Sequence, residues 1–512
     1  MDRKKSKKIQ NIRIILTNAF MTISVLVIVF VLILIAQGYS ISHDGNIQQS
    51  GLIQIDSTPR GANVKIDGET QLSRTKIGKM LSPGNHDFVI SKSGYDTWHS
   101  TATVFSGLLT NIEWVRLFPL EKTPEEVQNF GEFRMASLDP SRTTIIAAEQ
   151  NSSSLSVIDL QNEKAKTTKI DLPELLGIDP ESAKTANIFI DSWNTNSTHA
   201  LLRWHKDDAT TAWFILNIDN PDKSRNISEI SGLNITKALI ANDSASKFWL
   251  LDNEQKLYSI DISATIPSPN LITESVEKIT NNKDIVAYTK LAARETDPNI
   301  SERTLYIYKD GELDSTTIKK LGLADANADF VMGTYWDAEW LAYYADKNVE
   351  VLSGKYPSAD KKTNSLKSIH TSVLDFKPQT ISANPLQRII SFAGSDQYYS
   401  YDIVNDQNFT FKANTNISSI NWLDNFIIWQ RNNNKVIIRD FDGQNRREII
   451  NDIDNDLPVV ISKNNKWLYY FTIAEQDIVE TNTEAEQAAE ISNEAEIEAT
   501  PKTVYTLKRL SL

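Results

Sequence analysis

Cysteine is entirely absent from this chain of 512 residues. Its absence excludes disulfide bonds, thiolate metal sites and cysteine nucleophiles. A clustered basic face is also lacking outside the extreme N-terminus, and the chain has a formal net charge of −13 and a pI of about 5.1. Because a nucleic-acid-binding protein would carry such a face, we expect no nucleic acid among the partners.

The sequence motifs of common enzymes are missing as well. No G-x-S-x-G elbow, H-E-x-x-H zinc motif or glycine-rich phosphate loop occurs. His199 and His205 share a predicted strand, but no third metal ligand accompanies them. The run 452–456 resembles the start of a calcium loop, yet it lacks the following glycine and has Lys463 in place of the bidentate glutamate, so a turn is favoured. We therefore expect no catalytic, cofactor-binding or metal-ligating residues, and no cofactor.

Charged residues are lacking between Ile14 and Ser42, and the run from Ala19 to Ala36 is almost wholly apolar. A bilayer core of about 30 Å needs roughly 20 such residues in a helix. Lysine and arginine cluster before this run and not directly after it, which favours a cytoplasmic N-terminus. The sequence predicts a basic cytoplasmic tail at 1–13, a single transmembrane helix at 14–38 in contact with the lipid bilayer of the cell membrane, and an extracytoplasmic bulk.

A cleaved signal peptide is the alternative interpretation of this segment. Ala36-Gln37-Gly38 offers small residues at a suitable offset for cleavage. However, the apolar run is longer than the usual signal-peptide core of about 7–15 residues, which favours an anchor. A helix buried in a soluble core is the third interpretation, and a run this apolar disfavours it.

A small β domain is predicted at 51–120, after a polar linker at 39–50. Apolar and polar residues alternate along short segments, as they do in half-buried strands. Asp67-Gly68 and Ser82-Pro83-Gly84-Asn85 are turn signals between them. The spacing predicts a compact antiparallel sandwich, with strands at 53–56, 63–67, 78–81, 86–91, 97–105 and 112–117.

An ordered set of turns in this region resembles the PEGA domain family. The set comprises Pro59-Arg60-Gly61-Ala62, a strand that ends in Asp67-Gly68, the Pro83-Gly84 turn and Gly94-Tyr95. Two positions depart from the family pattern: Arg60 replaces the acidic residue, and 73–76 replaces a Gly-x-Thr-Pro turn. The resemblance implies an extracytoplasmic sandwich module without known catalytic residues.

The region 125–512 repeats a weak pattern of a polar turn, an apolar strand, a short link and a second strand. The repeats recur at intervals of about 37 to 56 residues, which brackets the roughly 40–50 residues of a four-stranded propeller blade. The predicted strand pairs are 143–148 with 155–160, 199–204 with 212–218, 248–251 with 257–262, 285–290 with 304–309, 340–345 with 349–353, 388–393 with 398–404, 426–430 with 435–441, and 467–473 with 504–510.

This pattern resembles WD-repeat-like and TolB-like β-propellers, although no strict motif recurs. The repeats predict eight blades, or seven if one of them is degenerate. Closure of the ring would need the last blade to take a strand from the region near Thr123–Phe130. A strand supplied in this way covers the otherwise unpaired edge of the sheet. The fold class is therefore mainly β, with an N-terminal transmembrane helix, a small PEGA-like β-sandwich and a seven- or eight-bladed β-propeller.

One segment departs from the repeat. The stretch 475–498 has nine acidic residues and no basic one, and it lies within a predicted disordered loop at 475–502. A solvated loop is the favoured interpretation, and a segment that binds cations or a partner is the alternative.

Without a visible catalytic constellation, recognition is the function that this architecture favours. We expect an interaction or scaffold protein, anchored in the membrane, that binds an envelope protein or a cell-wall polymer. The alternatives are an enzyme that acts on envelope glycans with acids in the propeller channel and a purely structural envelope component.

Overall fold

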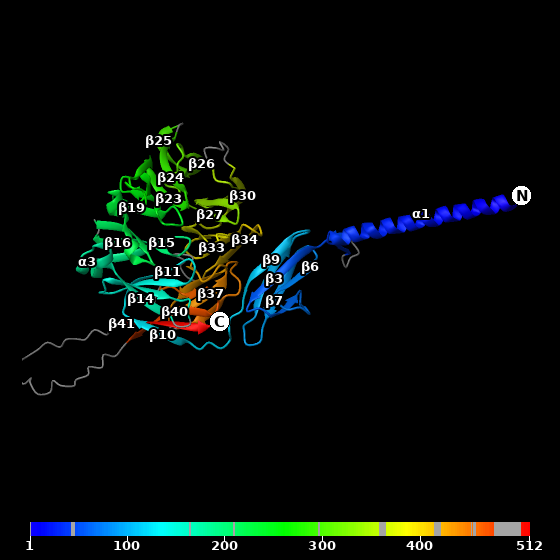
Figure 1. The fold of residues 1–512 in the computed structure, drawn as a ribbon, viewed down its shortest axis with the longest axis horizontal. Helices are drawn as coiled ribbons and strands as arrows, with labels where there is room; N and C mark the ends of the chain where they lie inside the picture. Colours follow the sequence, from blue (N-terminus) through cyan, green and yellow to red (C-terminus); the bar gives the residue numbers. More distant parts are fainter. Residues whose placement is uncertain are drawn as a thin grey trace, which may run out of the picture. The chain divides into compact units, whose positions relative to one another are not determined.

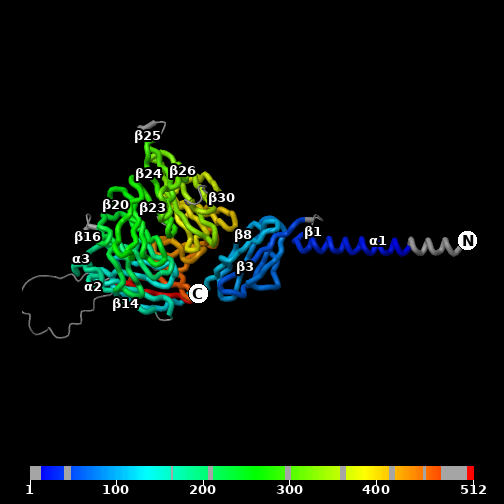
Figure 2. The backbone as a smooth tube through the Cα atoms, turned by 45° about the horizontal axis from the view of Figure 1, so that its top comes forward, coloured from blue at the N-terminus to red at the C-terminus, as the bar shows by residue number. Residues whose placement is uncertain are grey.

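The computed structural model describes residues 2–41, 47–162, 165–207, 210–294, 297–357, 365–413, 421–451, 453, 457–475 and 503–512. The chain divides into two compact units, Met1–Glu121 and Lys122–Leu512 (Figures 1 and 2). The predicted acidic loop at 475–502, apart from Glu475, lies outside the described residues, as do all residues of 452–456 except Ile453.

The first unit begins with helix α1 (Asp2–Ala36). Its segment Arg13–Ala36 has a mean hydropathy of 3.1 and exposes its side chains. In the described part of the chain, this is the one helix long and apolar enough to cross a membrane. A signal sequence near the N-terminus has the same properties, so both interpretations of the segment stand.

The predicted linker at 39–50 contains a short hairpin. Strand β1 (Tyr39–Ile41) pairs with β2 (Ile47–Gln49), and residues 42–46 between them lie outside the described residues. Gly38 leaves the helix at a φ of +80°, a conformation that glycine adopts without steric cost.

Two further sheets follow in the described residues of the first unit. One has the order β6-β3-β9, and the other has the order β5-β4-β7-β8. Their bounds are β3 (Gly51–Thr58), β4 (Asn63–Ile66), β5 (Glu69–Thr70), β6 (Ile77–Leu81), β7 (Gly84–Ser91), β8 (Trp98–Val104) and β9 (Leu109–Arg116). Alternate residues of β3, β7 and β8 are buried, which places Ile53, Phe88 and Trp98 in the core.

The prediction of a purely antiparallel domain is wrong for one pair. Strands β3 and β9 run parallel, with Leu52 opposite Leu109 and Ile55 opposite Ile112. Tight hairpins enforce antiparallel pairing between sequence neighbours, but the chain passes through the second sheet between these two strands. Their direction is therefore set by how the sheets pack, which short-range patterns do not record.

The larger unit comprises, in its described residues, eight four-stranded antiparallel sheets. Sheet 1 unites the two ends of the unit, and sheets 2 to 8 each use four consecutive strands. Sheet 1 consists of β10 (Glu125–Phe130), β41 (Thr503–Ser511), β40 (Trp467–Glu475) and β39 (Val460–Ile461). Sheet 2 consists of β11 (Phe133–Leu138), β12 (Thr144–Glu149), β13 (Ser154–Asp159) and β14 (Lys166–Asp171). Sheet 3 consists of β15 (Asn187–Trp193), β16 (His199–Asp207), β17 (Thr210–Asn217) and β18 (Arg225–Asn226), and sheet 4 of β19 (Ile235–Ile240), β20 (Lys247–Asp252), β21 (Leu257–Asp261) and β22 (Asn270–Thr273).

Sheets 5 to 8 continue the series along the chain. Sheet 5 consists of β23 (Val276–Asn282), β24 (Ile285–Arg294), β25 (Asp297–Lys309) and β26 (Thr316–Leu323). Sheet 6 consists of β27 (Ala328–Tyr335), β28 (Ala338–Ala345), β29 (Asn348–Gly354) and β30 (Lys367–Val373). Sheet 7 consists of β31 (Thr380–Ala383), β32 (Ile389–Ala393), β33 (Gln397–Asp402) and β34 (Gln407–Lys412), and sheet 8 of β35 (Asn421–Trp422), β36 (Ile427–Asn432), β37 (Lys435–Asp440) and β38 (Arg447–Ile450). Short helices α2 (Leu172–Leu176), α3 (Pro180–Thr185) and α4 (Ile227–Ser231) and the single 3₁₀ turn η1 (Pro221–Lys223) complete the described elements of this unit.

Each predicted strand pair forms the two middle strands of one sheet. For example, β28 and β29 coincide with the predicted pair 340–345 and 349–353. Middle strands bury residues on both faces and therefore carry the longest apolar runs. Most outer strands were not predicted because they are short or alternate weakly; β30, for instance, exposes five of its seven residues.

Apolar clusters join consecutive sheets. Sheets 1 and 2 share Phe133 and Phe471, sheets 3 and 4 share Trp213, and sheets 6 and 7 share Trp340 and Phe392. The first strands β11, β15, β19, β23, β27 and β31 lie next to one another in series. Figure 1 shows the sheets following one another around the unit in sequence order, from cyan through green and yellow to red.

The prediction that the region near Thr123–Phe130 supplies a strand to the C-terminal sheet is confirmed. Strand β10 pairs with β41 in an antiparallel register that sets Phe130 opposite Tyr505. On the other side of this sheet, the backbone N–H of Ile461 donates to the carbonyl of Leu423 in sheet 8. Sheet 1 therefore contacts both sheet 2 and sheet 8.

Candidate ligand-binding cavity

A cavity of about 660 Å³ opens where the first strands of sheets 3 to 7 end. The loops that connect the first strand of each sheet to the second supply most of its lining. The lining residues are Trp193, Asn194, Thr195, Ile240, Asn242, Asp243, Asn281, Asn282, Lys283, Asp284, Ile285, Thr334, Glu339, Tyr356, Pro385, Leu386 and Gln387.

Short polar side chains stabilise the turns in these loops by accepting backbone hydrogen bonds. The side-chain oxygen of Asn194 accepts the backbone N–H groups of the residues four and five positions later, at 2.9 Å each. Asp139, Asn242 and Asn384 accept the corresponding pair of N–H groups in sheets 2, 4 and 7. Asn and Asp favour such turns because their side chains replace a backbone acceptor.

Hydrogen bonds between neighbouring loops fix the cavity wall. The side-chain amide of Asn194 donates to the carbonyl of Asp243 at 2.9 Å, which joins sheets 3 and 4. The amide of Asn282 donates to the Thr334 hydroxyl, and the Thr334 N–H donates to Gln387 Oε1 at 2.6 Å. These bonds join sheets 5, 6 and 7, so the wall is formed before any ligand binds.

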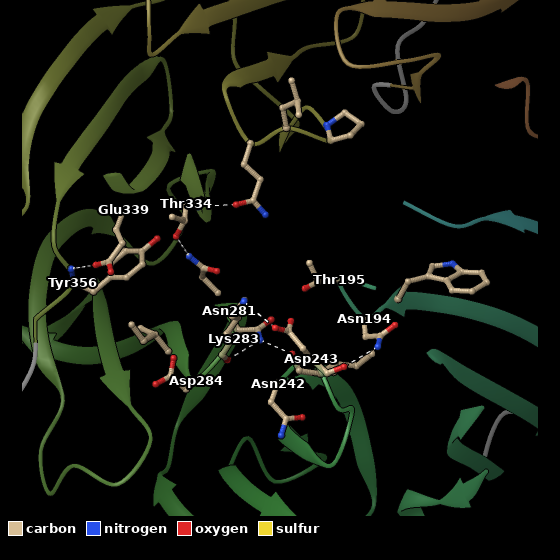
Figure 3. Close-up of a pocket in the computed structure, with 17 residues that line it drawn as sticks. Asn194, Thr195, Asn242, Asp243, Asn281, Lys283, Asp284, Thr334, Glu339 and Tyr356 are labelled. Carbon is tan, nitrogen blue, oxygen red and sulfur yellow. Dashed lines mark hydrogen bonds and ion pairs between the residues drawn. The ribbon is translucent and has the colours of Figure 1, made fainter. Parts of the chain in front are cut away.

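An ion pair lies within the cavity. Lys283 Nζ is 3.0 Å from Asp243 Oδ2, and Figure 3 shows the two side chains next to each other. The hydrogen bond from Lys283 lowers the pKa of the Asp243 carboxyl. Asp243 is therefore ionised at neutral pH, which suits a binding partner and not a proton donor.

The opposite side of the cavity is closed by Tyr356. Its hydroxyl accepts the N–H of Gly333 and donates toward the carbonyls of Gly333 and Trp340. Burial raises the pKa of this phenol, so it stays neutral. A Cβ at Gly333 would approach the Trp340 ring to 2.5 Å, which explains the glycine there.

Carboxyl groups also line the cavity. Glu339 accepts the backbone N–H of Tyr356 and lies 3.6 Å from Lys355 Nζ, while Asp284 is exposed. Figure 3 shows Glu339 and Tyr356 on one side of an open space and Asn194 and Thr195 on the other. Amides, hydroxyls and charged groups thus offer both hydrogen-bond donors and acceptors to a polar ligand.

The histidines that the sequence singled out lie in separate environments. His199 contacts the Thr198 hydroxyl and the Asn217 amide, whereas His205 contacts Thr211 and Arg203. In the described residues no group of three or more His, Asp or Glu side chains is placed to hold a metal ion.

Sequence reasoning did not predict the cavity. Its signal was present in the Asn- and Asp-rich turns, such as Trp193-Asn194-Thr195 and Ala241-Asn242-Asp243, which were interpreted only as links between strands. Turn residues from five sheets converge only when the sheets are packed in order, so their common location was invisible along the chain.

The succession of four-stranded antiparallel sheets, with first strands adjacent and one sheet built from both ends of the unit, is that of a β-propeller. In the first unit, residues 50–116 match the PEGA domain family model. This match confirms the resemblance that the ordered turns indicated for that region.

Solved structures resemble the chain only in fold. The β-propeller domain of Myceliophteria thermophila Cps50 (Swd1) is 10% identical, with a TM-score of 0.39, over 64% of this chain and 98% of that one. The oligogalacturonate lyase of Vibrio parahaemolyticus is 8% identical, with a TM-score of 0.35, over 75% and 98%. The tricorn protease is 12% identical, with a TM-score of 0.35, over 75% and 40%. None of the curated proteins matches the chain.

Proposed function

We propose that this chain is a binding or scaffold protein, anchored in a bacterial-type cell membrane by residues 14–38, that recognises an envelope protein or a cell-wall polymer on the outer side. The PEGA match, the propeller fold and the apolar N-terminal helix support this role. The basic residues before the helix support a cytoplasmic N-terminus.

In this proposal residues 51–120 form a β-sandwich, and residues 125–512 form a closed propeller of eight blades. Eight sheets in the described residues support that number over seven. The apolar clusters between consecutive sheets, together with the bond from Ile461 to Leu423, support closure.

The prearranged polar cavity carries the proposal of a binding role. Its walls are fixed by bonds between loops, such as those of Asn282 with Thr334 and of Thr334 with Gln387. A site that is fixed in advance loses little conformational entropy when it binds. Its polar lining suits a hydrophilic polymer or protein surface, and not an apolar metabolite.

Retention of envelope material by the full-length protein in detergent micelles tests this role. The fractions are washed cell-wall polymer and solubilised envelope proteins. We expect one fraction to be retained, and Asp284→Lys to weaken retention about tenfold, which corresponds to about 1.4 kcal/mol. Asp284 lines the cavity and is exposed, so its substitution leaves the core intact.

Glu254→Lys is the matched control. It makes the same change of charge in the turn between β20 and β21, at the opposite ends of the strands. Equal retention by both variants, or no retention of either fraction, argues against the proposed role. Separately, protease treatment of intact cells tests the orientation: protection of residues 51–512 would contradict it.

An enzyme that acts on envelope glycans is the second candidate. The carboxyl groups of Asp243, Asp284 and Glu339 around one cavity favour it, because glycosidases use paired carboxyls. The lowered pKa of Asp243 argues against a proton donor at that position. Release of reducing ends from a glycan panel, abolished by Glu339→Gln, would establish this candidate in place of simple binding.

A further inference from the structure

Sheets 5 and 6 differ from their neighbours in the loop between the first two strands. In sheet 5, Asn282 pairs with Ile285, so that Lys283 and Asp284 form a two-residue turn. In sheet 6, Tyr335 pairs with Ala338, which leaves Trp336-Asp337 as the corresponding turn. The structure therefore presents Lys283 and Trp336 at matching positions of adjacent sheets.

Trp336 occupies a backbone conformation that favours glycine. Its φ is +53°, and two-residue hairpin turns with a positive φ at the first position usually have glycine there. A bulky residue in this region is strained, and such strain is typical of functional positions. The bulk of the indole is therefore not explained by the turn itself.

Four other residues with positive φ in these loops bond back to the preceding sheet. Arg142 donates to the carbonyl of Ile461, Ser197 bonds to the Ser141 hydroxyl, and Gln387 accepts from the N–H of Thr334. Lys283 does the same through its ion pair with Asp243. They stabilise the packing of the sheets.

Trp336 differs from these four residues. Its residue is 85% exposed, and its ring stacks on the neighbouring Tyr335, with ring centroids 5.4 Å apart and an angle of 14° between the planes. The Tyr335 ring thus supports one face of the indole. A supported and exposed aromatic face is a rigid platform for a ligand.

The hairpin that carries this platform also contributes to the polar cavity. Thr334 and Glu339 line the cavity, and they are opposite each other in the hairpin that carries Trp336 at its tip. Lys283, in the matching turn of sheet 5, lines the same cavity. A single extended ligand can therefore contact the aromatic platform and the cavity at once.

We propose that this site binds a chain of β-linked pyranose sugars, an inference that rests on the proposed binding function and names its ligand class. The C–H groups on the face of a β-linked pyranose pack on a flat aromatic ring. Neighbouring sugar hydroxyls can be bonded by the side-chain amides of Asn281 and Asn282, which carry both donors and acceptors, and by the carboxylate of Asp284, which accepts hydrogen bonds.

A peptide ligand fits this site less well. Extended peptides bind by adding a strand to a sheet edge or by filling apolar pockets. Here the wall consists of hairpin loops such as Lys283-Asp284, and not of an open strand edge. The main lining groups are amides, hydroxyls and charged side chains.

Calorimetric titration of the full-length protein, in a detergent without a sugar headgroup, tests the inference. The probes are soluble hexamers of β-1,4-linked N-acetylglucosamine, β-1,4-linked glucose and α-1,4-linked glucose. We expect at least one β-linked hexamer to bind more tightly than the α-linked hexamer. Trp336→Ala should weaken that binding about fivefold, as for the loss of one aromatic stack.

Two variants control for the loss of apolar surface. Trp336→Phe retains a stacking ring and should bind within about twofold of the original chain. Ile266→Ala removes a side chain that is 83% exposed on another loop and should leave binding unchanged.

Absence of binding by every hexamer, equal binding of the α- and β-linked hexamers, or unchanged binding by Trp336→Ala overturns the inference. Its failure is distinguishable from failure of the proposed function. Retention of envelope material that responds to Asp284→Lys would still support a binding role without a sugar ligand.

Discussion

The two units of this molecule are specified by different kinds of interaction. The first unit, called the PEGA unit below, contains the PEGA match at 50–116, and the propeller unit is Lys122–Leu512. In the PEGA unit, turns at fixed spacing connect the strands of a small core that contains Phe88 and Trp98. In the propeller unit, the sheets are joined in series by apolar clusters, and no single turn sequence recurs. Residues 50–116 of the first unit therefore match a family model by their sequence, whereas the second unit is recognisable only by the order of its strands.

This difference has an energetic basis. A small β domain rarely gains more than about 3–5 kcal/mol from its single core, so each turn and each core residue matters. In a repeated fold, many similar interfaces share the stability, and each tolerates variation. Substitutions placed in both units can test the contrast.

The largest expected effect is the loss of a buried tryptophan. Trp98→Ala in the PEGA unit and Trp213→Ala between sheets 3 and 4 each remove a side chain that is 0% exposed. Each should lower the free energy of unfolding by about 3–5 kcal/mol. We expect Trp98→Ala to unfold the small unit, and Trp213→Ala to leave the propeller folded but less stable.

Chemical denaturation followed by circular dichroism, combined with limited proteolysis, measures both outcomes. Rapid cleavage within 51–120 of the Trp98→Ala variant, with the propeller intact, is the expected pattern. A stable small unit in that variant would contradict the idea that its core is marginal.

The second prediction concerns pH and the buried Asp442. Its residue is 7% exposed, and burial raises the pKa of its carboxyl to about 6. Between about pH 4 and pH 6 the unfolded chain therefore binds fewer protons than the folded chain, so the free energy of unfolding falls as the pH rises. The contribution lost at pH 7 is up to about 3 kcal/mol.

Asp442→Asn should remove this loss. The amide oxygen can still accept the N–H of Gln444, as the carboxylate does at 2.9 Å. We expect the variant to be more stable than the original chain at pH 7 and similar to it at pH 4. Denaturation curves at both pH values measure this, and an equal gain at both would contradict it.

The PEGA unit should respond to pH with the opposite sign. Burial acts to raise the pKa of Asp67, but the N–H of Asp87 and the ring of His86 outweigh it and lower that pKa. A lowered folded-state pKa stabilises the fold above the unfolded value and loses that stability as the pH falls. This contribution should therefore disappear below about pH 4.

The smallest expected effect distinguishes the repeated turns from the sheet cores. Asp139 accepts the N–H groups of Ser141, Thr143 and Thr144, so Asp139→Ala leaves these donors unpaired. We expect a loss of about 2 kcal/mol in the free energy of unfolding. Asp139→Asn should cost about half as much, because its amide oxygen can still accept the N–H groups of Thr143 and Thr144, as Asn194 does for the equivalent pair in sheet 3. The amide nitrogen cannot accept the N–H of Ser141, which the second carboxylate oxygen of Asp139 accepts.

Thermal or chemical unfolding of the two variants measures the difference. Equal losses for the alanine and asparagine substitutions would contradict the idea that the bonds to the N–H groups of Thr143 and Thr144 stabilise the turn.

Much of the fold could be predicted from the sequence because the middle strands carry apolar residues on both faces. In β28 and β29, for example, the consecutive residues Trp340 and Leu341 point to opposite faces and are both buried, as is Val351. Outer strands such as β14, with its sequence KTTKID, expose most of their residues and lack such a signal. The parallel pairing of β3 with β9 was missed because no hairpin connects these strands.

The sequence by itself determined the apolar helix, the turns of the PEGA region and the alternation of the strands, because these depend on residues close together along the chain. Only the tertiary structure decided that Asn194, Lys283 and Gln387 surround one cavity. It also decided that Trp336 stands exposed at the tip of the hairpin that carries Thr334 and Glu339. The reason is physical: loops far apart in the sequence meet only when the apolar faces of their sheets pack in order, and that packing is a property of the whole unit.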